Sequence, residues 1–406
     1  MTAVALIGNM NNNHFALMRH LRDLGADAHL FLYSNEHPHF LPQCDTLDWL
    51  RWKPFVHELG VSNGGRDAFH RPIRATASRL EGFEVFLGNG IAPVLFARMG
   101  KQLDVFVPYC DGVEFVVEHE WKWDKPLASA YTALRKAAME RALRRNVDIA
   151  VTANMHDHSL ATFRRLGKPV TNMFIPMLYE ERAPGEVALP DELRAAAARM
   201  NAASLAVFSH VSHFWKSLPV AHYMGGVGKR NQWLIEGFAQ YVRDSRDRDA
   251  VLTMVEYGPD IGASKNLIGA LGIGAQVMWL PLMTRVQIMQ LIAHADIGGS
   301  EFAGMLWGGA GWEFLSKGVP MLHYLDDPGA YTLPDRPLPP FFNTASPQEV
   351  AAVLRDHDRE TLKRVGASAR AWYDRHQGRA LAARYLAMLE ARRADGLGGG
   401  QHDCRF

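Results

Sequence analysis

The sequence predicts an α/β protein with two Rossmann-like, doubly wound parallel-sheet domains that face a central cleft. Short apolar runs alternate with helical segments along the chain, an order typical of parallel strands joined by crossover helices. The runs are continuously apolar, as expected when helices cover both faces of a sheet. The alternation starts twice, at VALIG (4–8) and at LAVFSHVS (205–212), and 406 residues suit about two domains.

In the first half, each predicted strand stops at a turn that bears Gly, Asp or Asn. VALIG is the first strand, the turn NMNNNHF (9–15) opens a helix, and AHLFLY (28–33) is the second strand. The later strands are FEVFLGNG (83–90), DVFVPYCDG (104–112) and VDIAVTA (147–153). Helical segments lie between them, at PVLFARMGKQL (93–103) and at the basic ALRKAAMERALRRN (133–146).

The second half repeats this order after a change of composition. Residues 181–200 are rich in Pro and Ala, and we interpret them as a linker with a short helix. A strand (205–212), a loop and the amphipathic helix WLIEGFAQYVRD (233–244) follow. Later, Ser346 and Glu349 predict a capping box at the start of a helix. The predicted boundaries are 1–180 for the first domain, 181–200 for the linker, 201–365 for the second domain, 366–392 for C-terminal helices that can pack back toward the first domain, and 393–406 for a disordered tail.

The stretch from Val251 to Tyr324 is the most informative part of the chain. We read it as strand (VLTMV), turn, strand (LGIGAQVMWLPLM), helix (TRVQIMQLIAHAD), Gly-rich turn, helix with Glu313, and strand. Glycines directly before a helix let backbone N–H groups approach a phosphate, and the helix N-terminus adds a favourable dipole. A carboxylate in such a helix can accept hydrogen bonds from sugar hydroxyls. The pattern therefore predicts a nucleotide-type site, although neither half has a GxGxxG dinucleotide fingerprint.

Composition excludes several classes of function. A formal net charge of +1 argues against bulk nucleic-acid binding. Three dispersed cysteines give neither a disulfide framework nor a CxxC metal site, and the histidine pairs have no metal constellation around them, so we predict no metal and no cofactor. No apolar run approaches the ~20 residues that span a bilayer, and the N-terminus lacks signal-peptide features. We expect a cytoplasmic protein, with peripheral contact at the inner face of the membrane as an open alternative.

The strongest candidates for ligand contact lie in the second half. Glu313 has apolar neighbours, so its charge needs a partner, which a ligand or a salt bridge can provide. Gly308 and Gly309 precede its helix and favour phosphate or ribose contact, with a flexible loop as the alternative. Lys229 lies at a helix entry, where a cation is unfavourable for the dipole. Diphosphate binding would explain it, and Arg230 is an equally plausible cation from the residues alone.

Other candidates follow predicted strands, where open α/β sheets place ligand-binding residues. Asp111 ends one strand, with an ordinary Asp-Gly turn as the alternative. Asn12, Asn13 and His14 follow the first strand, and helix capping alone explains at least one of the asparagines. His213 follows a strand of the second half, where a structural hydrogen bond is the commoner role.

Two surface features remain. His119, Trp121 and Trp123 form an aromatic, amphipathic loop that can contact an acceptor or a membrane surface, or can be a packed lid. The basic segment 134–145 can meet an anionic membrane surface, and a solvated helix is the commoner reading.

Taken together, these segments resemble the GT-B-fold glycosyltransferases, in particular the large retaining family four. The resemblance covers most of the chain and is best in the second half. It rests on KRNQWLIEGFAQ as the family's lysine-bearing helix entry, TMVEYGPD with Gly258 as its Gly-Pro strand end, VMWLPLMTRVQIMQLIAHADI as its strand-loop-helix, WGGAGWEFLSKGVPML as its glutamate helix, and VDIAVTANMHDHSLATFRRLG as its last amino-domain strand and helix.

The resemblance implies a retaining, metal-independent transferase that uses a nucleotide-diphosphate sugar. Glu313 would hold the donor ribose, Lys229 the diphosphate, and Gly308 and Gly309 the sugar or phosphate. Asp111 would lie on the acceptor side. The acceptor would be a glycan, glycolipid or glycoprotein in bacterial surface polysaccharide or glycoconjugate assembly.

The sequence also departs from the family pattern. Its paired glutamates stand eight positions apart, yet Met305 lies eight residues before Glu313, and Glu301 comes four residues too early. Ser212-His213 stands where arginine is expected, and Arg230 where glycine is usual; His213 or Arg230 can replace the lost contacts. These departures motivate a catalytically decayed binding or scaffold protein as an alternative, and a sugar-nucleotide epimerase is a third hypothesis.

Overall fold

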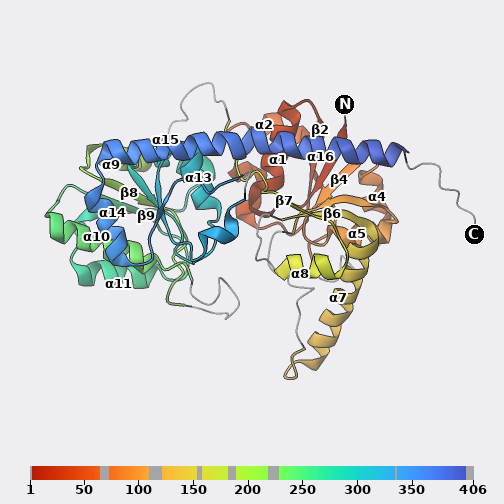
Figure 1. Cartoon of the computed structure of the whole chain (residues 1–406), viewed down its shortest axis with the longest axis horizontal. Helices are drawn as coiled ribbons and strands as arrows, with labels where there is room; N and C mark the ends of the chain where they lie inside the picture. Colours follow the sequence, from red (N-terminus) through yellow and green to blue (C-terminus); the bar gives the residue numbers. More distant parts are fainter. Residues whose placement is uncertain are drawn as a thin grey trace, which may run out of the picture. The chain divides into compact units, whose positions relative to one another are not determined.

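The computed structural model describes residues 2–64, 73–108, 121–152, 158–181, 189–217, 228–333 and 336–398. The chain divides into two compact units (Figure 1). Unit 1 comprises Met1–Glu181 together with Gln377–Phe406, and unit 2 comprises Arg182–His376.

The described part of unit 1 contains a seven-stranded parallel sheet in the order β3-β2-β1-β4-β5-β6-β7. The registers pair Leu6 with Leu30 on one side of β1 and with Leu87 on the other. The strands are β1 (Ala3–Ile7), β2 (Asp27–Leu32), β3 (Val56–Glu58), β4 (Val85–Gly88), β5 (Leu103–Phe106), β6 (Val147–Thr152) and β7 (Val170–Asn172).

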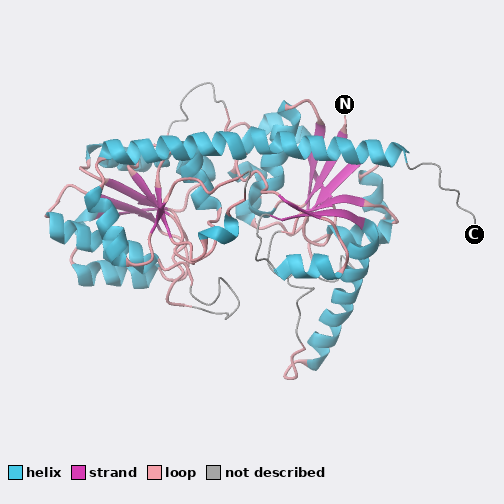
Figure 2. Cartoon of the chain, in the orientation of Figure 1, coloured by secondary structure: helices cyan, strands magenta, loops and turns pink. Residues whose placement is uncertain are grey.

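Helices flank this sheet on both faces, as Figure 2 shows. They are α1 (Asn13–Asp23), α2 (Trp49–Trp52), α4 (Arg74–Arg79), α5 (Ala92–Met99), α7 (Pro126–Asn146), α8 (His158–Arg165) and α16 (Gly378–Gly398). α5 packs on α7, and α16 packs on α1 and β4. Phe96, Phe106 and Phe163 are fully buried in the resulting core, which explains why their segments read as continuous apolar runs.

The described part of unit 2 contains a six-stranded parallel sheet in the order β10-β9-β8-β11-β12-β13. The strands are β8 (Ala206–Ser209), β9 (Val251–Val255), β10 (Val277–Leu280), β11 (Ile297–Gly299), β12 (Met321–His323) and β13 (Phe342–Asn343). The helices are α9 (Asp191–Ala202), α10 (Asn231–Ser245), α11 (Ile261–Leu271), α12 (Arg285–Ile292), α13 (Gly309–Lys317), α14 (Pro347–Asp356) and α15 (Arg359–His376). Its core joins Leu234 and Phe238 of α10 to Leu252 of β9 and Val350 of α14.

The predicted fold class, two doubly wound parallel sheets, is confirmed, and the differences concern short elements. α11 lies between β9 and β10, where the sequence predicts only a turn. β11 follows α12 directly and was missed, because its three residues, IGG, carry little apolar signal. Ser346 caps α14 as predicted, because its hydroxyl oxygen accepts from the N–H of Glu349. The carboxylate of Glu349, however, accepts from the N–H of Ala345 and not from that of Ser346.

The boundaries of the units can be compared with the predicted ones. α9 lies mostly within the predicted linker, but it buries Leu193 and Met200 and belongs to unit 2. The passage from unit 2 to unit 1 falls between His376 and Gln377, between α15 and α16. α16 continues to Gly398, which is a correction to the tail predicted from residue 393.

Candidate functional site

Strand order places the candidate site of unit 2 at one edge of its sheet. Chain order reverses between β8 and β11, which are hydrogen-bonded neighbours. In open α/β sheets, ligands bind beyond the carboxyl ends of the strands at such a switch point. His210 follows β8, and Ser300 and Glu301 follow β11.

Glu313 is buried at this edge and forms an ion pair with Arg285 and a close contact with the ring of His210. The side chain is 4% exposed, one carboxylate oxygen accepts from Nε of Arg285 at 2.8 Å, and the other pairs with Nε2 of His210. Burial raises the pKa of the carboxyl, but His210 and Arg285 outweigh burial, so the pKa lies below its usual range. Glu313 is therefore an ionised, preorganised acceptor and not a solvated surface residue.

Glu301 forms a second charged pair next to the Gly-rich turn. Its carboxylate accepts from Nζ of Lys229 at 2.7 Å and from the backbone N–H of Gly308 at 3.3 Å. Burial raises the pKa of Glu301, but the attraction of Lys229, with smaller contributions from His323 and Gly308, brings it below the usual range. The ion pair also explains why Lys229 stands at the entry of α10 against the helix dipole.

Gly308 lies close to this carboxylate. A Cβ at Gly308 would lie 3.3 Å from Oε1 of Glu301. Gly309, the first residue of α13, has Arg285 and Glu313 as its nearest side-chain neighbours, at 3.7 and 4.0 Å from a built Cβ. The two glycines thus bring the N-terminus of α13 close to both carboxylates.

Several buried polar atoms around this edge have no hydrogen-bond partner among the described residues. Nδ1 of His210 and Oγ of Ser300 lie at the ends of the two switch-point strands. Nδ1 of His323 and Nε1 of Trp307 are also buried without a hydrogen-bond partner among the described residues. Because a buried polar group without a partner costs ~1–3 kcal/mol, such a group needs a partner, which a ligand, a water molecule or an ion can provide.

His323, on β12, is a neutral neighbour of the site. Its Nε2 lies 2.9 Å from the carbonyl oxygen of Met305. Burial lowers the pKa of His323 to about 4, although the Met305 carbonyl and Glu301 act in the opposite direction. At neutral pH the ring therefore carries no charge, so Nε2 donates to Met305.

Two other predicted donor contacts, Arg230 and His213, form hydrogen bonds within unit 2. Arg230 donates to the carbonyl of Phe302 at 3.1 Å and lies over the ring of Trp233. His213 is 1% exposed, and its Nδ1 lies 2.8 Å from Oγ of Ser264. Burial lowers the pKa of His213 to about 4. Their assignment to the donor stays a prediction.

Gly258 is required by a close approach of two backbone segments. Its φ is +107°, and a Cβ there would lie 2.5 Å from the carbonyl oxygen of His213. The loop after β8 is also held by Asp260, whose carboxylate accepts from the N–H groups of Trp215, Lys216 and Ser217. The loop geometry near the switch point is thus fixed by backbone contacts.

In unit 1, Asn12, Asn13 and His14 lie where β1 passes into α1. All three are buried, and both side-chain polar atoms of Asn13 and Nε2 of His14 have no hydrogen-bond partner among the described residues. Burial lowers the pKa of His14 to about 4. The expected capping is different: Asn12 makes no cap bond, and Oδ1 of Asn9 accepts from the N–H of Phe15 instead.

The predicted acceptor-side residue Asp111 and the predicted aromatic loop fall at the edge of the described residues. Asp111 and His119 lie outside the described residues. Trp121 and Trp123 are 45% and 85% exposed, so they do not form a packed lid.

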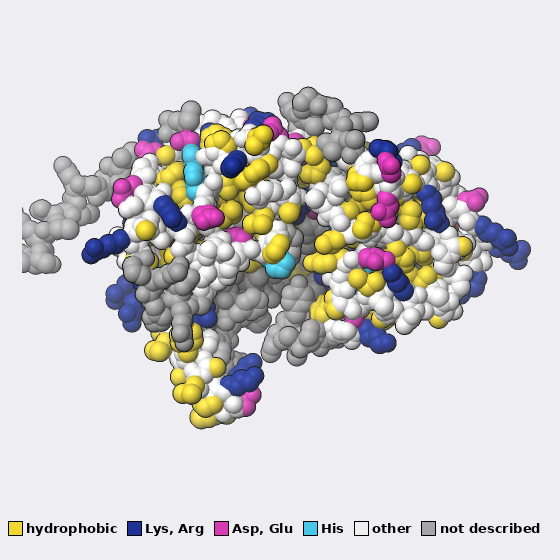
Figure 3. All heavy atoms as spheres, turned by 180° about the vertical axis from the view of Figure 1, so that it is seen from behind, with side chains coloured by type: hydrophobic (Ala, Val, Ile, Leu, Met, Phe, Trp, Pro, Cys, Tyr) yellow, Lys and Arg dark blue, Asp and Glu magenta, His cyan; other side chains and the backbone are white. Residues whose placement is uncertain are grey.

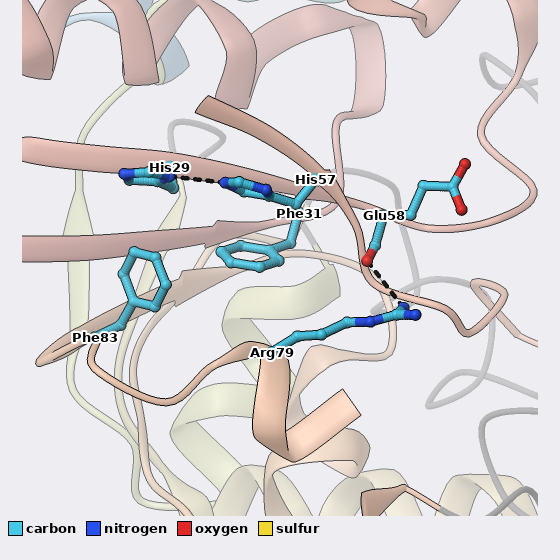
Figure 4. A pocket seen from close by; sticks show the side chains of 6 residues that line it. All are labelled: His29, Phe31, His57, Glu58, Arg79 and Phe83. Carbon is cyan, nitrogen blue, oxygen red and sulfur yellow. Dashed lines mark hydrogen bonds between the residues drawn. The ribbon is translucent and has the colours of Figure 1, made fainter. Parts of the chain in front are cut away.

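Unit 1 also has an open hollow of about 450 Å³ at the β2–β3 edge, lined by His29, Phe31, His57, Glu58, Arg79 and Phe83 (Figure 4). Nδ1 of His29 lies 2.8 Å from Nε2 of His57, and the two rings are stacked. None of these residues was singled out from the sequence. Across the described part of the chain, no group of three or more His, Cys, Asp or Glu side chains is arranged to hold a metal ion.

His210 and Arg285 are the site residues that sequence reasoning missed, and Glu301 was noted only as an acid at the wrong spacing. The position of His210, one residue after a buried strand, was a usable signal, because residues there face ligands in α/β sheets. Arg285 gave none, since an arginine in the first turn of a helix is usually solvated.

Comparisons with known proteins agree with the fold. No protein-family model matches the sequence, and no curated protein matches it. Among solved structures, the chain is similar to WaaG, a glycosyltransferase involved in lipopolysaccharide biosynthesis, at 14% identity and a TM-score of 0.51, covering 95% of this chain and 99% of that one. It is also similar to sucrose-phosphate synthase from Thermosynechococcus elongatus, at 13% identity and a TM-score of 0.54, covering 97% and 100%.

A third similar structure is a putative UDP-N-acetylglucosamine 2-epimerase from Listeria monocytogenes, at 12% identity and a TM-score of 0.54, covering 97% of this chain and 98% of that one. At identities this low, structural similarity establishes the fold alone. The fold is the GT-B fold of two Rossmann-like units.

Proposed function

We propose that this chain is a glycosyltransferase that takes a sugar from a nucleotide-diphosphate donor bound at the switch point of unit 2. The observation that carries the proposal is the pair of buried, ionised carboxylates, Glu313 and Glu301, beside the N-terminus of α13. Such carboxylates accept hydrogen bonds from hydroxyl groups, and the ribose and sugar of a nucleotide sugar present several.

Charges at this edge suit the departing nucleotide diphosphate. Lys229 and Arg285 supply two cations, and the N-terminus of α13 adds the positive end of a helix dipole. An ammonium group has three N–H donors, so Lys229 can hold Glu301 and a phosphate oxygen together. Preorganised groups of this kind stabilise the negative charge that develops as the sugar–phosphate bond breaks, without a metal.

The orphaned polar atoms fit the same ligand. Nδ1 of His210 and Oγ of Ser300 can each exchange a hydrogen bond with a donor hydroxyl or phosphate. On this proposal Glu313 holds the ribose, Gly308 and Gly309 line the sugar or phosphate, and the transfer retains the anomeric configuration.

The acceptor is proposed to be a glycan, glycolipid or glycoprotein in bacterial surface polysaccharide or glycoconjugate assembly. Asn12, Asn13, His14 and Asp111 are its proposed contacts. Of these, Asn13 and His14 carry buried polar atoms for which the described residues provide no hydrogen-bond partner. A bound acceptor could provide that partner. The protein is proposed to act in the cytoplasm.

The test is donor binding by the full chain. Titration calorimetry and thermal shift with a panel of uridine, guanosine and adenosine diphosphate sugars should identify at least one donor that binds. Lys229→Met should weaken its binding by about tenfold or more, since a charged hydrogen bond to phosphate is worth ~1.5–3 kcal/mol. Lys317→Met, at the exposed far end of α13, is the matched control and should bind normally. Binding of no sugar nucleotide would refute the proposal.

The similarity to an epimerase structure, with a TM-score of 0.54, favours one second candidate. An epimerase would convert its sugar nucleotide without any acceptor, whereas a transferase would turn it over only when an acceptor is supplied. Proton NMR of the donor incubated with the protein alone separates the two. A decayed binding protein would bind the nucleotide sugar and convert it in neither assay.

A further inference from the structure

The turn before α7 and the first half of that helix expose an unusual amount of apolar surface. Of the nine large hydrophobic side chains that are exposed in the described part of the chain, five fall between Trp121 and Leu134. The exposed fractions are 45% for Trp121, 85% for Trp123, 86% for Leu127, 37% for Tyr131 and 71% for Leu134. We call these five side chains the α7 apolar tip. Scattered exposed hydrophobics are ordinary, but a contiguous group of them marks an interaction surface.

The tip has a defined local structure. The N–H of Lys122 donates to Oγ of Ser129 at 2.9 Å, and that hydroxyl donates back to the carbonyl of Lys122 at 3.2 Å. Ser129 is 1% exposed, and the rings of Trp121 and Trp123 meet edge to face at 5.8 Å. Binding through this turn therefore orders little that is not already ordered, which lowers the entropic cost of association.

The apolar tip is not a continuation of the face that anchors α7. At about 100° per residue, Leu127, Tyr131 and Leu134 fall within roughly 60° of one another around the helix. The anchoring residues Met139 and Leu143, both fully buried, lie roughly 120–160° away from Leu127. α7 packs on α5 and β6, and its first half projects from unit 1 as the gold helix in Figure 1. Figure 3 shows yellow side chains gathered on the projecting lobe.

The same segment has a larger net positive charge than the whole chain. Residues 121–146 hold seven Lys and Arg and two Asp and Glu, a net charge of +5, in a chain whose net charge is +1. One of the two acids, Glu140, is paired with Arg165 at 2.7 Å. By the same helical angle, Arg141 and Arg145 lie within roughly 40° of Leu127, further along the same side. The seven cations are Lys122, Lys125, Arg135, Lys136, Arg141, Arg144 and Arg145.

We propose that the α7 apolar tip is a docking surface for an anionic lipid membrane. Tryptophan and tyrosine favour the headgroup level of a bilayer, where the ring is half apolar and half hydrated. Leucines beside them enter the acyl boundary, and the arginines that follow on the same side meet anionic headgroups. A lipid surface fits better than a folded protein partner, because the tip is convex and projects, whereas protein partners usually meet apolar side chains in pockets. The proposal does not depend on the donor site of unit 2.

The charges make the proposal specific to anionic lipid. The full-length chain should float with vesicles of phosphatidylcholine mixed with phosphatidylglycerol. It should bind vesicles of phosphatidylcholine alone at least about tenfold more weakly, because each cation near an anionic surface contributes about fivefold. Raising the salt concentration should release the protein, since the Debye length falls.

Two double variants test the two parts of the surface. Trp123→Ser with Leu127→Ser should lower binding to the mixed vesicles by at least about tenfold, because it removes two inserted side chains. Arg141→Gln with Arg145→Gln should lower it by about 25-fold and flatten the salt dependence. Leu50→Ser is the matched control, because Leu50 lies in α2 and is 80% exposed; it should bind as the wild type does.

All of these side chains are exposed, so the variants should keep the melting temperature of the wild type, which confirms that they fold. The proposal is overturned if the wild type binds both kinds of vesicle equally or neither, or if the Trp123/Leu127 variant floats as the wild type does. Capture of an acidic protein through the tip without vesicle binding would also overturn it, in favour of a protein partner.

Discussion

The two side-chain contacts of Glu313, with Arg285 and His210, give the sharpest prediction, through the substitution Glu313→Gln. Glutamine keeps the shape of the side chain but removes its charge. One of the partners, Arg285 or His210, then faces the amide NH₂ group instead of a carboxylate oxygen. Breaking a buried charged pair costs ~3–5 kcal/mol, and a retained amide hydrogen bond recovers ~1 kcal/mol. We expect the free energy of unfolding of unit 2 to fall by about 2–4 kcal/mol.

Donor affinity should fall as well, if Glu313 accepts ribose hydroxyls. A hydrogen bond to a charged group contributes ~1.5–3 kcal/mol, which corresponds to about 10–150-fold in the dissociation constant. Denaturant unfolding measures the first effect and titration calorimetry with the bound nucleotide sugar measures the second.

Asp296→Asn is a matched control for both measurements. Oδ2 of Asp296 accepts from the N–H of Ala206 at 2.8 Å and from Arg359 at 2.9 Å, so it too is a doubly engaged carboxylate. It lies, however, at the amino ends of β8 and β11, the edge away from the proposed site. Asp296→Asn should lower stability but leave donor affinity unchanged. The reasoning is refuted if Glu313→Gln unfolds as the wild type does, or if both variants lose affinity equally.

Three further predictions concern the same unit and the buried histidines. Glu301→Gln should leave Lys229 without its carboxylate and lower the stability of unit 2 by about 2–4 kcal/mol in denaturant unfolding, whereas a loss below 0.5 kcal/mol would contradict the buried pair. Gly258→Ala should destabilise by about 2–4 kcal/mol, because φ is +107° and the new Cβ would meet the carbonyl of His213 at 2.5 Å; an unchanged melting temperature would show that the loop relaxes freely. His14 and His323 have folded-state pKa values of about 4 against 6.5 for an unperturbed ring, so the unfolded chain binds protons first as the pH falls. The folded protein keeps its full stability above pH ~6.5 and loses about 3 kcal/mol for each histidine as the pH falls toward ~4. His323→Gln should therefore flatten the dependence of the unfolding free energy on pH. An equally steep profile would exclude His323 as a contributor.

The sequence by itself determined the class of fold and indicated that the charge of Glu313 needs a partner. Continuous apolar runs such as VLTMV require a sheet covered on both faces, and local periodicity encodes this directly. The apolar neighbours of Glu313 predicted that its charge has a partner, a ligand or a salt bridge, and the structure has the side chain 4% exposed and paired with Arg285. Short strands such as β11 escaped detection, because three residues that include two glycines give no periodic signal.

Only the tertiary structure decided which partners these charges have. His210 is 103 residues from Glu313 in the chain, and Lys229 is 72 residues from Glu301. In a parallel sheet, the carboxyl ends of all strands meet at one edge, and the order of the strands chooses which residues become neighbours there. That order results from packing of whole helices and strands, so no local pattern around Glu313 or Lys229 contains it.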